Sequence, residues 1–550
     1  MIFESFLPPA DIPAVDVPTF YVNVSKSNLE HPDSIAYYDV STEKSLSFTQ
    51  LYAMYRQIGS GLVNRLNIQS GDVVAIFSSN SIYYAAAFLG IISAGAVCCT
   101  VSSVFKEGEL EYQMADCKAK ALFVGPKQAS VARNAMNKGL LTIPEDNIVV
   151  LDDDDAQGFP SLTKILSNMP FTPVVFNDKQ RAESTLAVIV YSSGTTGLPK
   201  GVMLSHRNII AYTVLSATMF EHIQSLDGKK KSEERNQRSL SILPFAHIYG
   251  LTSFITNSVA GAKTQYIMND FSVEKFLGAI QKHRIQTASV VPSVLNQMVK
   301  HKDITRYDLS LLMLLGSGGA PLPDGTHGEI NKRFPVRTGN GYGMSETCSG
   351  VCLMGDYKFI AGSVGFLYPG IQAKIVDPDS GRALGAGERG ELCLRGPTIM
   401  MGYLDRPEET AKTIDADGFL HTGDIAYIAK TGHIFITDRI KELIKYKGLQ
   451  VPAAELESIL IKHDMVSDAA VVGVHDPARN TEVPKAYVVA ECPSDKLARD
   501  LAEWVASHAA DHKRLRGGVE FIDAIPRNPS GKILHRELRA KHNARRGSKM

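Results

Sequence analysis

The sequence predicts an α/β protein with a large N-terminal domain of helix-covered β-sheets and a small α+β C-terminal domain. The length of 550 residues exceeds that of a single domain, and the pattern changes near residue 438. Strand-like and helix-like patterns alternate before that point, which is typical of parallel sheets covered by helices. The clearest pairs of a β-type run and a helical pattern are Asp72–Phe77 with Ile82–Ala94, Ala121–Val124 with Ala129–Gly139, and Ser289–Val291 with Ser293–Val299.

A charged junction separates the two predicted domains. Residues 438–442 read Asp-Arg-Ile-Lys-Glu, and about a hundred residues follow, which is enough for a small domain with its own core. We therefore expect domains at 1–437 and 438–550. A second polar and charged stretch, 222–239, predicts a surface loop inside the first domain.

The composition is that of an ordinary globular protein, with 44% apolar and 21% charged residues. Lysine plus arginine equals aspartate plus glutamate at 58 each, so no overall positive field favours nucleic acid as a partner. The last forty positions are locally basic, and a solvated helix face accounts for most of these residues. The seven cysteines are scattered, which predicts buried free thiols in a reducing compartment.

Two segments bear on membranes and targeting. Tyr83–Phe105 is uncharged, but Gly90 and Gly95 interrupt it and its second half is β-type, so we expect a buried helix followed by a buried strand, not a transmembrane segment. The first nine residues lack the basic start and long apolar core of a signal peptide. The end of the sequence, Ser548–Met550, reads Ser-Lys-Met and approximates the peroxisomal address Ser-Lys-Leu, which would be read by an import receptor.

The most informative stretch is 191–202, Tyr-Ser-Ser-Gly-Thr-Thr-Gly-Leu-Pro-Lys-Gly-Val. It lies between an apolar β-type run and a helix that Ser205 can cap, so we expect a strand, a glycine-rich turn and a helix. Backbone N–H groups, hydroxyls and a lysine in such a turn form a phosphate-binding loop. The glycine spacing is not that of a Walker loop, and the alternative is a flexible Ser/Gly linker. The predicted phosphate ligands are Ser192, Ser193, Gly194, Thr195, Thr196 and Lys200.

Five further segments carry functional chemistry. Ser317–Pro321 can pass close to a flat ring, 340–346 combines an aromatic ring, a hydroxyl and a carboxylate, and Thr422–Asp424 presents a carboxylate in a turn. Residues 438–448 are dense in cations, and Asn528–Lys532 is a turn that presents one lysine.

With these motifs in this order, the chain resembles the acyl-adenylate-forming superfamily, which includes acyl-CoA synthetases, 4-coumarate–CoA ligases and beetle luciferases. The resemblance spans about residues 45–540. Within the family, 445–451 (Lys-Tyr-Lys-Gly-Leu-Gln-Val) and 453–457 (Ala-Ala-Glu-Leu-Glu) are similar to free-standing CoA ligases and luciferases.

The resemblance implies two half-reactions. A carboxylate attacks the α-phosphate of Mg-ATP to give acyl-AMP and pyrophosphate, and the thiolate of CoA then displaces AMP. Both first reactants are anions, so the chemistry needs charge neutralisation more than an acid–base pair. Lys532 would bridge the substrate carboxylate and the α-phosphate, and Glu346 with Thr196 would hold Mg²⁺. An exposed turn lysine is the alternative interpretation of Lys532.

The resemblance also assigns the nucleotide and acyl sites. Asp424 would accept both ribose hydroxyls with Arg439 nearby, and Tyr342 would stack on adenine. His247 would gate the acyl pocket, although a core histidine and a turn-forming aspartate are the plain alternatives for His247 and Asp424. The remaining nucleotide-side residues are Gly318, Gly319, Ala320, Asn340, Gly341 and Ser345. Asn340 and Ser345 depart from the glutamine and threonine of many CoA ligases. The serine keeps the hydroxyl for phosphate contact, whereas the shorter asparagine would shift a contact beside adenine, and we expect the activity to be kept.

Members of the family rotate the small domain between half-reactions. The rotation would exchange Lys532 for a face that carries Lys445, with Lys441 as the hinge. A surface cation is the alternative for Lys445. The other residues of that face, which would line the CoA side, are Lys447, Gly448 and Gln450.

These expectations define an ATP-dependent carboxylic acid:CoA ligase that uses ATP, Mg²⁺ and coenzyme A. Its substrates would be aryl or arylalkanoic acids or medium-chain fatty acids, and its location the peroxisome, with the cytoplasm as the alternative. A luciferase-like oxygenase and a non-catalytic nucleotide- or acyl-binding protein are the competing hypotheses.

Overall fold

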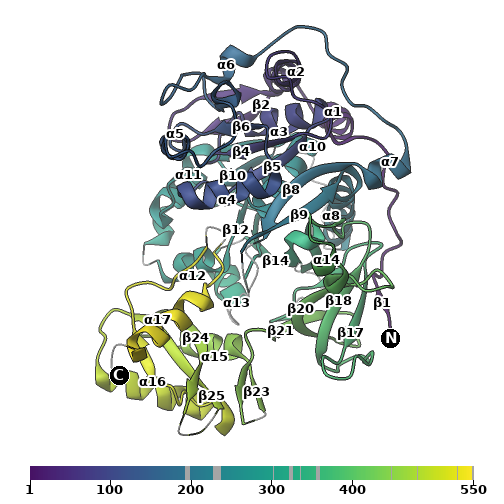
Figure 1. The fold of residues 1–550 in the computed structure, drawn as a ribbon. Coiled ribbons are helices and arrows are strands. Elements are labelled where there is room, and N and C mark those ends of the chain that lie inside the picture. The colour runs from purple at the N-terminus through teal and green to yellow at the C-terminus, as the bar shows by residue number, and fades with distance from the viewer. Residues whose placement is uncertain are drawn as a thin grey trace.

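The structure is a computed structural model that describes residues 1–192, 198–226, 237–301, 303–320, 326–334, 336–354, 360–447, 449–477, 479, 481–528 and 531–547. Within these residues the chain forms a large α/β part and a smaller C-terminal α+β part, so the predicted fold class is confirmed (Figure 1). No helix of the described chain is both long and apolar enough to cross a membrane.

A seven-stranded, mostly parallel sheet forms the part of the molecule that, apart from β19, is drawn in blue. On its central strand, Val74 and Ile76 join the main core, whereas Ala75 and Phe77 join a second cluster on the opposite face. The sheet is therefore buried on both faces, which explains its continuous apolar strands. From edge to edge its strands are β19 (Gly402–Tyr403), β9 (Lys200–Ser205), β8 (Leu186–Ser192), β5 (Val97–Val101), β4 (Val73–Phe77), β6 (Ala121–Val124) and β7 (Ile148–Val150).

A nine-stranded sheet lies beside it, and its central strands, β11, β10, β12, β13 and β14, run parallel. The carboxyl ends of these strands bring distant turns to one edge, as in other parallel sheets. In order the strands are β16 (Phe366–Leu367), β15 (Ser349–Met354), β14 (Arg337–Met344), β13 (Leu314–Ser317), β12 (Thr287–Val290), β10 (Arg238–Ser241), β11 (Thr264–Ile267), β2 (Ile35–Asp39) and β3 (Ser45–Ser47).

A five-stranded antiparallel sheet, drawn in green apart from β1, completes the large part. Its strands are β1 (Phe3–Glu4), β17 (Gln372–Val376), β18 (Gly390–Arg395), β20 (Leu420–Ile428) and β21 (Ile434–Arg439). The helices of the large part are α1 (Val17–Asn28), α2 (Phe48–Asn64), α3 (Tyr84–Ser93), α4 (Glu107–Cys117), α5 (Ala129–Asn137), α6 (Leu162–Ile165), α7 (Lys179–Ser184), α8 (His206–Leu226), α9 (Ile248–Gly250), α10 (Asn257–Ala260), α11 (Val273–His283), α12 (Pro292–Lys300), α13 (Thr326–Arg333) and α14 (Pro407–Thr413).

The C-terminal part has its own core, formed by buried residues between Ile444 and Leu538. Its strands are β22 (Ile444–Tyr446), β23 (Leu449–Val451), β24 (Val466–Asp476), β25 (Thr481–Ala490) and β26 (Val519–Phe521), and its helices are α15 (Ala453–Ile461), α16 (Asp495–His508) and α17 (His535–Gly547).

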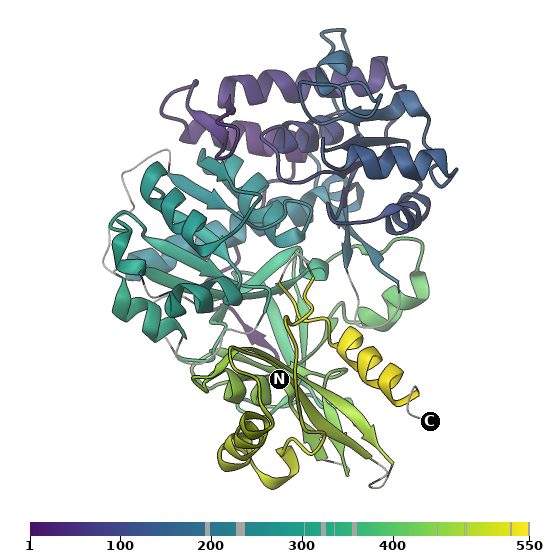
Figure 2. The ribbon, with the colours of Figure 1, turned by 90° about the vertical axis from the view of Figure 1, so that its left-hand side faces the viewer.

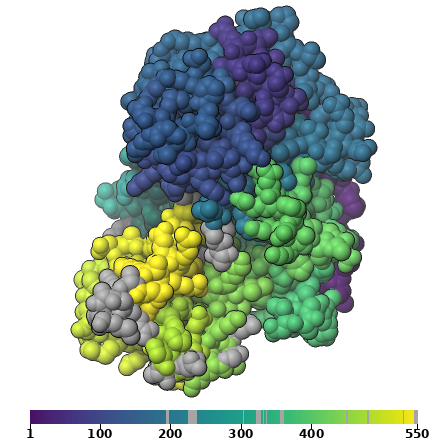
Figure 3. All heavy atoms as spheres, viewed as in Figure 1, coloured from purple at the N-terminus to yellow at the C-terminus, as the bar shows by residue number. Residues whose placement is uncertain are grey.

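The C-terminal part lies directly against the rest of the molecule (Figure 3). Figure 2 shows the yellow segment before α17 rising toward the teal strands of the nine-stranded sheet. The Nζ atom of Lys300 on α12 also donates to the carbonyl oxygen of Val466 at 2.8 Å. The two parts thus share a junction at the edge of that sheet.

Several local expectations are confirmed. The segment Tyr83–Phe105 contains α3 followed by β5, as the change of pattern predicts. Six of the seven cysteines are buried and free, and Cys492 is exposed. The polar stretch 222–239 is partly helical, because α8 continues to Leu226, and 227–236 lie outside the described residues.

A core substitution tests the second core. Leu501 on α16 is fully buried, so Leu501→Ala should destabilise the C-terminal part by about 2–5 kcal/mol through lost apolar contact and a cavity. Glu503→Ala, an exposed position on the same helix, should leave the thermal transition within about 1 °C of the wild type. Calorimetric unfolding measures both, and equal transitions for the two variants would contradict the packing described here.

Candidate active site

One continuous cavity of about 2750 Å³ lies where the sheets and the C-terminal part meet. It collects predicted site residues that are more than three hundred positions apart in the sequence. Those that line it are Ser192, Lys200, His247, Gly318, Gly319, Gly341, Tyr342, Ser345, Glu346, Asp424, Arg439 and Lys532. The predicted residues Ser193, Gly194, Thr195, Thr196 and Gly448 lie outside the described residues.

The segment around the predicted phosphate loop differs from expectation in one respect. The loop joins β8 to β9, an antiparallel pair in which Ser192 lies opposite Lys200. The strand–turn–helix prediction is therefore wrong, because α8 begins only at His206, beyond β9. Ser205 caps that helix as predicted, since its Oγ accepts from the backbone N–H of Asn208 at 3.1 Å. A hairpin, not a helix N-terminus, presents this loop.

Lys200 lies at the start of β9, beside the loop. Its ammonium pairs with Glu409 and lies 5.1 Å from the ring centre of Tyr403. Burial and then the charges of Lys441 and Arg406 lower the pKa of Lys200. Cations crowded at one edge of a cavity favour a multiply charged anion there.

Asp424 is the best-supported carboxylate of the cavity. It is 4% exposed, its Oδ2 accepts from the hydroxyl of Tyr342 at 2.6 Å, and its Oδ1 forms an ion pair with Nε of Arg439 at 3.0 Å. Asp424 and Arg439 are direct partners on β20 and β21, so the backbone register fixes their pairing. The carboxylate is held by both partners at the wall of the cavity.

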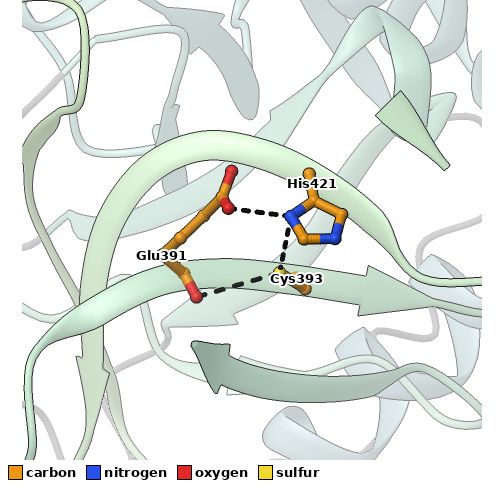
Figure 4. Close-up of side chains that lie close together, drawn as sticks. All are labelled: Glu391, Cys393 and His421. Carbon is orange, nitrogen blue, oxygen red and sulfur yellow. Dashed lines mark hydrogen bonds and ion pairs between the residues drawn. The ribbon is translucent and has the colours of Figure 1, made fainter. Parts of the chain in front are cut away.

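The turn before Asp424 rests on three neighbouring side chains (Figure 4). Oε1 of Glu391 accepts from the backbone N–H of Gly423 at 3.0 Å, and its Oε2 lies 2.8 Å from Nδ1 of His421. The Sγ atom of Cys393 lies 3.5 Å from the same Nδ1, and burial raises the pKa of this thiol to about 12. The trio has the residue types of a metal site. Because both oxygens of Glu391 are already engaged and the thiol is protonated, we assign it to supporting the turn.

Glu346 is a second buried carboxylate, 5% exposed. The hydroxyl of Tyr403 donates to its Oε1 at 3.0 Å, and no ion pair among the described residues includes it. A buried carboxylate without a paired side-chain cation fits a hard divalent ion such as Mg²⁺. Glu346 is the described residue best suited to that ligand role.

Lys532 enters the cavity from the C-terminal part. Asn528 and Lys532 close a turn through two hydrogen bonds of 2.9 Å, and Gly531 has a φ of 84°. A Cβ on Gly531 would lie 3.1 Å from Val291, so a glycine lets the turn approach the large part. Burial and then Arg439 lower the pKa of Lys532 to about 8, against the opposing charges of Glu442, Asp424 and Glu346.

His247 lies close to this lysine. It caps α9, where its Nδ1 accepts from the backbone N–H of Tyr249 at 3.3 Å. Burial and the charge of Lys532 lower the pKa of His247 to about 4, so the imidazole is neutral at physiological pH. The ring of Tyr249 lies beside Gly318, where a Cβ would be 3.5 Å from it, so these residues form one wall of the cavity.

Other predicted residues lie elsewhere. Asn340 does not line the cavity, because Gly339 and Gly341 face it on β14 and the residue between them faces the opposite way. The amide of Asn340 donates to the carbonyl oxygen of Ser363 at 3.3 Å. Ala320 is also outside the lining.

The predicted CoA face lies away from the cavity. Lys445 and Lys447 are exposed around β22, and their backbone N–H groups donate to Glu482 and Thr481. The side chain of Gln450 is outside the described part of the structure. Lys532 and Lys445 therefore occupy different faces of the C-terminal part.

Sequence reasoning missed three residues that support the site. Tyr403 reaches Glu346 across 57 positions, and nothing in its local sequence marks that contact. Glu391 and His421 lie on neighbouring strands, and their alternation with buried residues was the only available signal.

The chain matches a family model described as AMP-binding enzyme over residues 24–404 and one for the AMP-binding enzyme C-terminal domain over 455–532. Peroxisomal OPC-8:0-CoA ligase 1 of Arabidopsis thaliana is 35% identical, covering 97% of this chain and 94% of its own. Luciferin 4-monooxygenase of Photinus pyralis is 35% identical, covering 92% and 91%. 4-Coumarate–CoA ligase 3 of Arabidopsis thaliana is 36% identical, covering 98% and 94%. Among solved structures, ATP-bound MatB from Rhodopseudomonas palustris superposes with a TM-score of 0.80 at 25% identity, covering 95% and 98%.

The support of Asp424 gives a testable expectation. Glu391→Gln keeps an acceptor for Gly423 but weakens the contact with His421, so the turn loosens and ATP binding should fall by about three- to tenfold. Titration calorimetry with ATP measures the change. Glu388→Gln, an exposed carboxylate of the adjacent turn, serves as the control, and equal affinities for both variants would contradict the supporting role.

Proposed function

This chain belongs to the AMP-binding enzyme family and is an AMP-forming acid–CoA ligase, and we propose that Lys532 carries its first half-reaction. The observation that supports this role most strongly is the position of Lys532. Its ammonium lies in the same cavity as Asp424, Glu346 and His247. Substrate carboxylate and α-phosphate are both anions, so a cation between them lowers the barrier to their approach.

The proposed nucleotide site follows from the surrounding contacts. Asp424 accepts the ribose hydroxyls beside Arg439, and the ring of Tyr342 stacks on adenine with Gly318 and Gly319 opposite. Ser192, Lys200 and the hydroxyls of 193–196 bind the β- and γ-phosphates. Glu346 and Thr196 hold Mg²⁺, which when bound neutralises phosphate charge.

We assign the second half-reaction to the opposite face of the C-terminal part. There the thiolate of CoA attacks the acyl carbonyl of acyl-AMP, and AMP leaves. Lys445, Lys447, Gly448 and Gln450 would line that face after rotation about Lys441. The exposed positions of Lys445 and Lys447 support this, since they leave the face available to replace Lys532. The domain limits proposed for this movement are 1–437 and 438–550.

The acid site is the wall formed by His247, Tyr249, Gly316 and Gly318. A neutral histidine beside an aromatic ring suits aryl or arylalkanoic acids and medium-chain fatty acids, which is the proposed substrate range. The names of two relatives, 4-coumarate–CoA ligase and OPC-8:0-CoA ligase, support that range.

We place the enzyme in the peroxisome, where an import receptor would bind Ser548–Met550. These three residues lie outside the described part of the structure. The support comes from their sequence and from the peroxisomal relative.

Separating the half-reactions tests the role of Lys532. Lys532→Ala should lower pyrophosphate release with ATP and an acid by about 100-fold or more, because one stabilising charge is lost. Conversion of supplied acyl-AMP and CoA to acyl-CoA should stay within about threefold of the wild type. Lys445→Ala should give the reverse pattern, and equal loss of both half-reactions in Lys532→Ala would contradict the assignment.

The same lysine predicts a pH dependence. Its pKa is lowered to about 8, so the charged form is lost as pH rises through that value, and pyrophosphate release should decline above pH 8. In Lys532→Arg the guanidinium stays charged, so the decline should disappear even if the rate is lower. Initial rates between pH 6 and 10 measure this, and a decline that persists in the arginine variant would assign it to another group.

The location has its own test. Deleting Ser548–Met550 from a fluorescent fusion should change a punctate peroxisomal distribution to a diffuse one, because the receptor-binding tripeptide is gone. A variant with Arg545→Ala and Arg546→Ala, which keeps the tripeptide, is the matched control. Unchanged puncta after the deletion would remove the targeting proposal.

A further inference from the structure

The cavity continues beyond the reaction site along one face of the nine-stranded sheet. Gly316 lies near the reaction site, and Ser239, Gln265 and Lys263 lie farther in. β12 and β13 contribute neighbouring residues to the lining, whereas the chain at β10, β11 and the first half of β14 contributes alternate ones. Such alternation is expected where the wall is a sheet face. The far end is bordered by α1 and α10, where the exposed Asn28 donates to the carbonyl oxygen of the buried Ala260 at 2.8 Å.

The strand register gives the depth of this inner end. Ser239 pairs with Gln265 on β11 and with Thr287 on β12, and Ser289 pairs with Gly316. By this register, Ile267 on β11 is level with Gly316 on β13, three strands away in the sheet. Lys263 lies four residues before Ile267 in the chain. At the usual spacings these steps are about 14 Å and about 13 Å, so the two backbone positions are about 19 Å apart.

Two polar groups at this end, the amide of Gln265 and the ammonium of Lys263, offer hydrogen-bond donors. Gln265 is 1% exposed and its Oε1 accepts from Ser241 Oγ at 2.6 Å, which leaves the amide NH₂ without a partner among the described residues. Among the described residues, Lys263 forms hydrogen bonds only through its backbone N–H and carbonyl oxygen, both with Ser258. Its ammonium has no counter-ion among those residues. Its side chain lies over Gly261, where an added Cβ would be 3.1 Å from Cε.

Lys263 is half-buried, and a ligand of opposite charge would compensate an ammonium that has no counter-ion among the described residues. Burial lowers the pKa of Lys263, and no charged group contributes to that shift. An apolar chain end would leave both donors unsatisfied, whereas an anionic oxygen group would satisfy them through charge-assisted hydrogen bonds.

We propose that Lys263 and Gln265 form a distal subsite for a second anionic group of the acid, so that, among straight-chain acids, an α,ω-dicarboxylic acid is preferred to the monocarboxylic acid of equal length. One carboxylate lies at Lys532 and reacts, and the other pairs with Lys263. The inference rests on the proposed function, because the reacting carboxylate sets the orientation of the chain.

The experiment compares matched acids on the holoenzyme with ATP, Mg²⁺ and CoA. Octanedioic, dodecanedioic and hexadecanedioic acids are each paired with the monocarboxylic, ω-hydroxy and ω-oxo acid of equal length. For the wild type, kcat/KM should be highest for a diacid. Lys263→Met keeps the side-chain length but removes the charge, so the diacid to monoacid ratio of kcat/KM should fall at least tenfold while the monoacid value rises. Lys263→Arg should retain part of the ratio, and Lys275→Met, exposed on α11, should leave it unchanged.

Each other outcome overturns the inference. An equal change for both acids in Lys263→Met would show that the lysine only shapes the cavity. Preference for the ω-oxo or ω-hydroxy acid over the diacid would show a neutral subsite. If the wild type released no pyrophosphate with any acid, the proposed function would fail. Calorimetric binding of dodecanedioic and dodecanoic acids to the wild type and to Lys263→Met would then still decide the inference, and equal affinities would refute it.

Discussion

The ammonium of Lys532 is buried at the junction of the two parts of the molecule, and the site is arranged around that charge. The nearby charge of Arg439 disfavours the protonated form of Lys532, whereas the nearby carboxylates of Glu442, Asp424 and Glu346 favour it. A charge in this position is tolerable only while carboxylates on both parts face it. The large part supplies Asp424 and Glu346, so the position of the C-terminal part depends on the pairing of charges across the junction. His247 stays neutral beside the lysine, which leaves Lys532 to neutralise the incoming anions.

The large part holds its own charges rigidly. Asp424 is fixed by the backbone register of β20 and β21, by the hydroxyl of Tyr342, and by a turn that rests on Glu391. The orientation of the carboxylate thus depends on the strand register, on Tyr342 and on Glu391 together. Each of these lies on a sheet with a buried face. In contrast, the turn that carries Lys532 is closed by hydrogen bonds between Asn528 and Lys532, and its Gly531 lies beside Val291 of the large part. The site around Asp424 is thus rigid, and the short turn that carries Lys532 approaches it as one unit.

Much of this was predictable from local sequence. The alternation of strand and helix patterns located β4, α3, β6 and α5 within two residues at most ends, because buried parallel strands and their covering helices have distinct periodicities. The hairpin of β8 and β9 was not predictable in this way. Lys200–Ser205 is apolar and short, and only its pairing with β8 distinguishes a strand from the start of a helix. The contact between Tyr403 and Glu346 joins residues far apart in the sequence, and the orientation of Asn340 depends on its contact with Ser363. The local sequence pattern reveals neither of these neighbours.

The alternating face of the nine-stranded sheet has a consequence for how acids of different length are distinguished. Two residues along a strand advance about 6.6 Å, and the residue between them faces away from the cavity. Along one strand, a polar side chain can therefore be placed only at depths that differ by this spacing. Substitutions at Ser239, Gln265 or Lys263 would shift the depth of the polar group by multiples of that spacing. The preferred acid length would then change by several carbon atoms at once, without any rearrangement of the backbone.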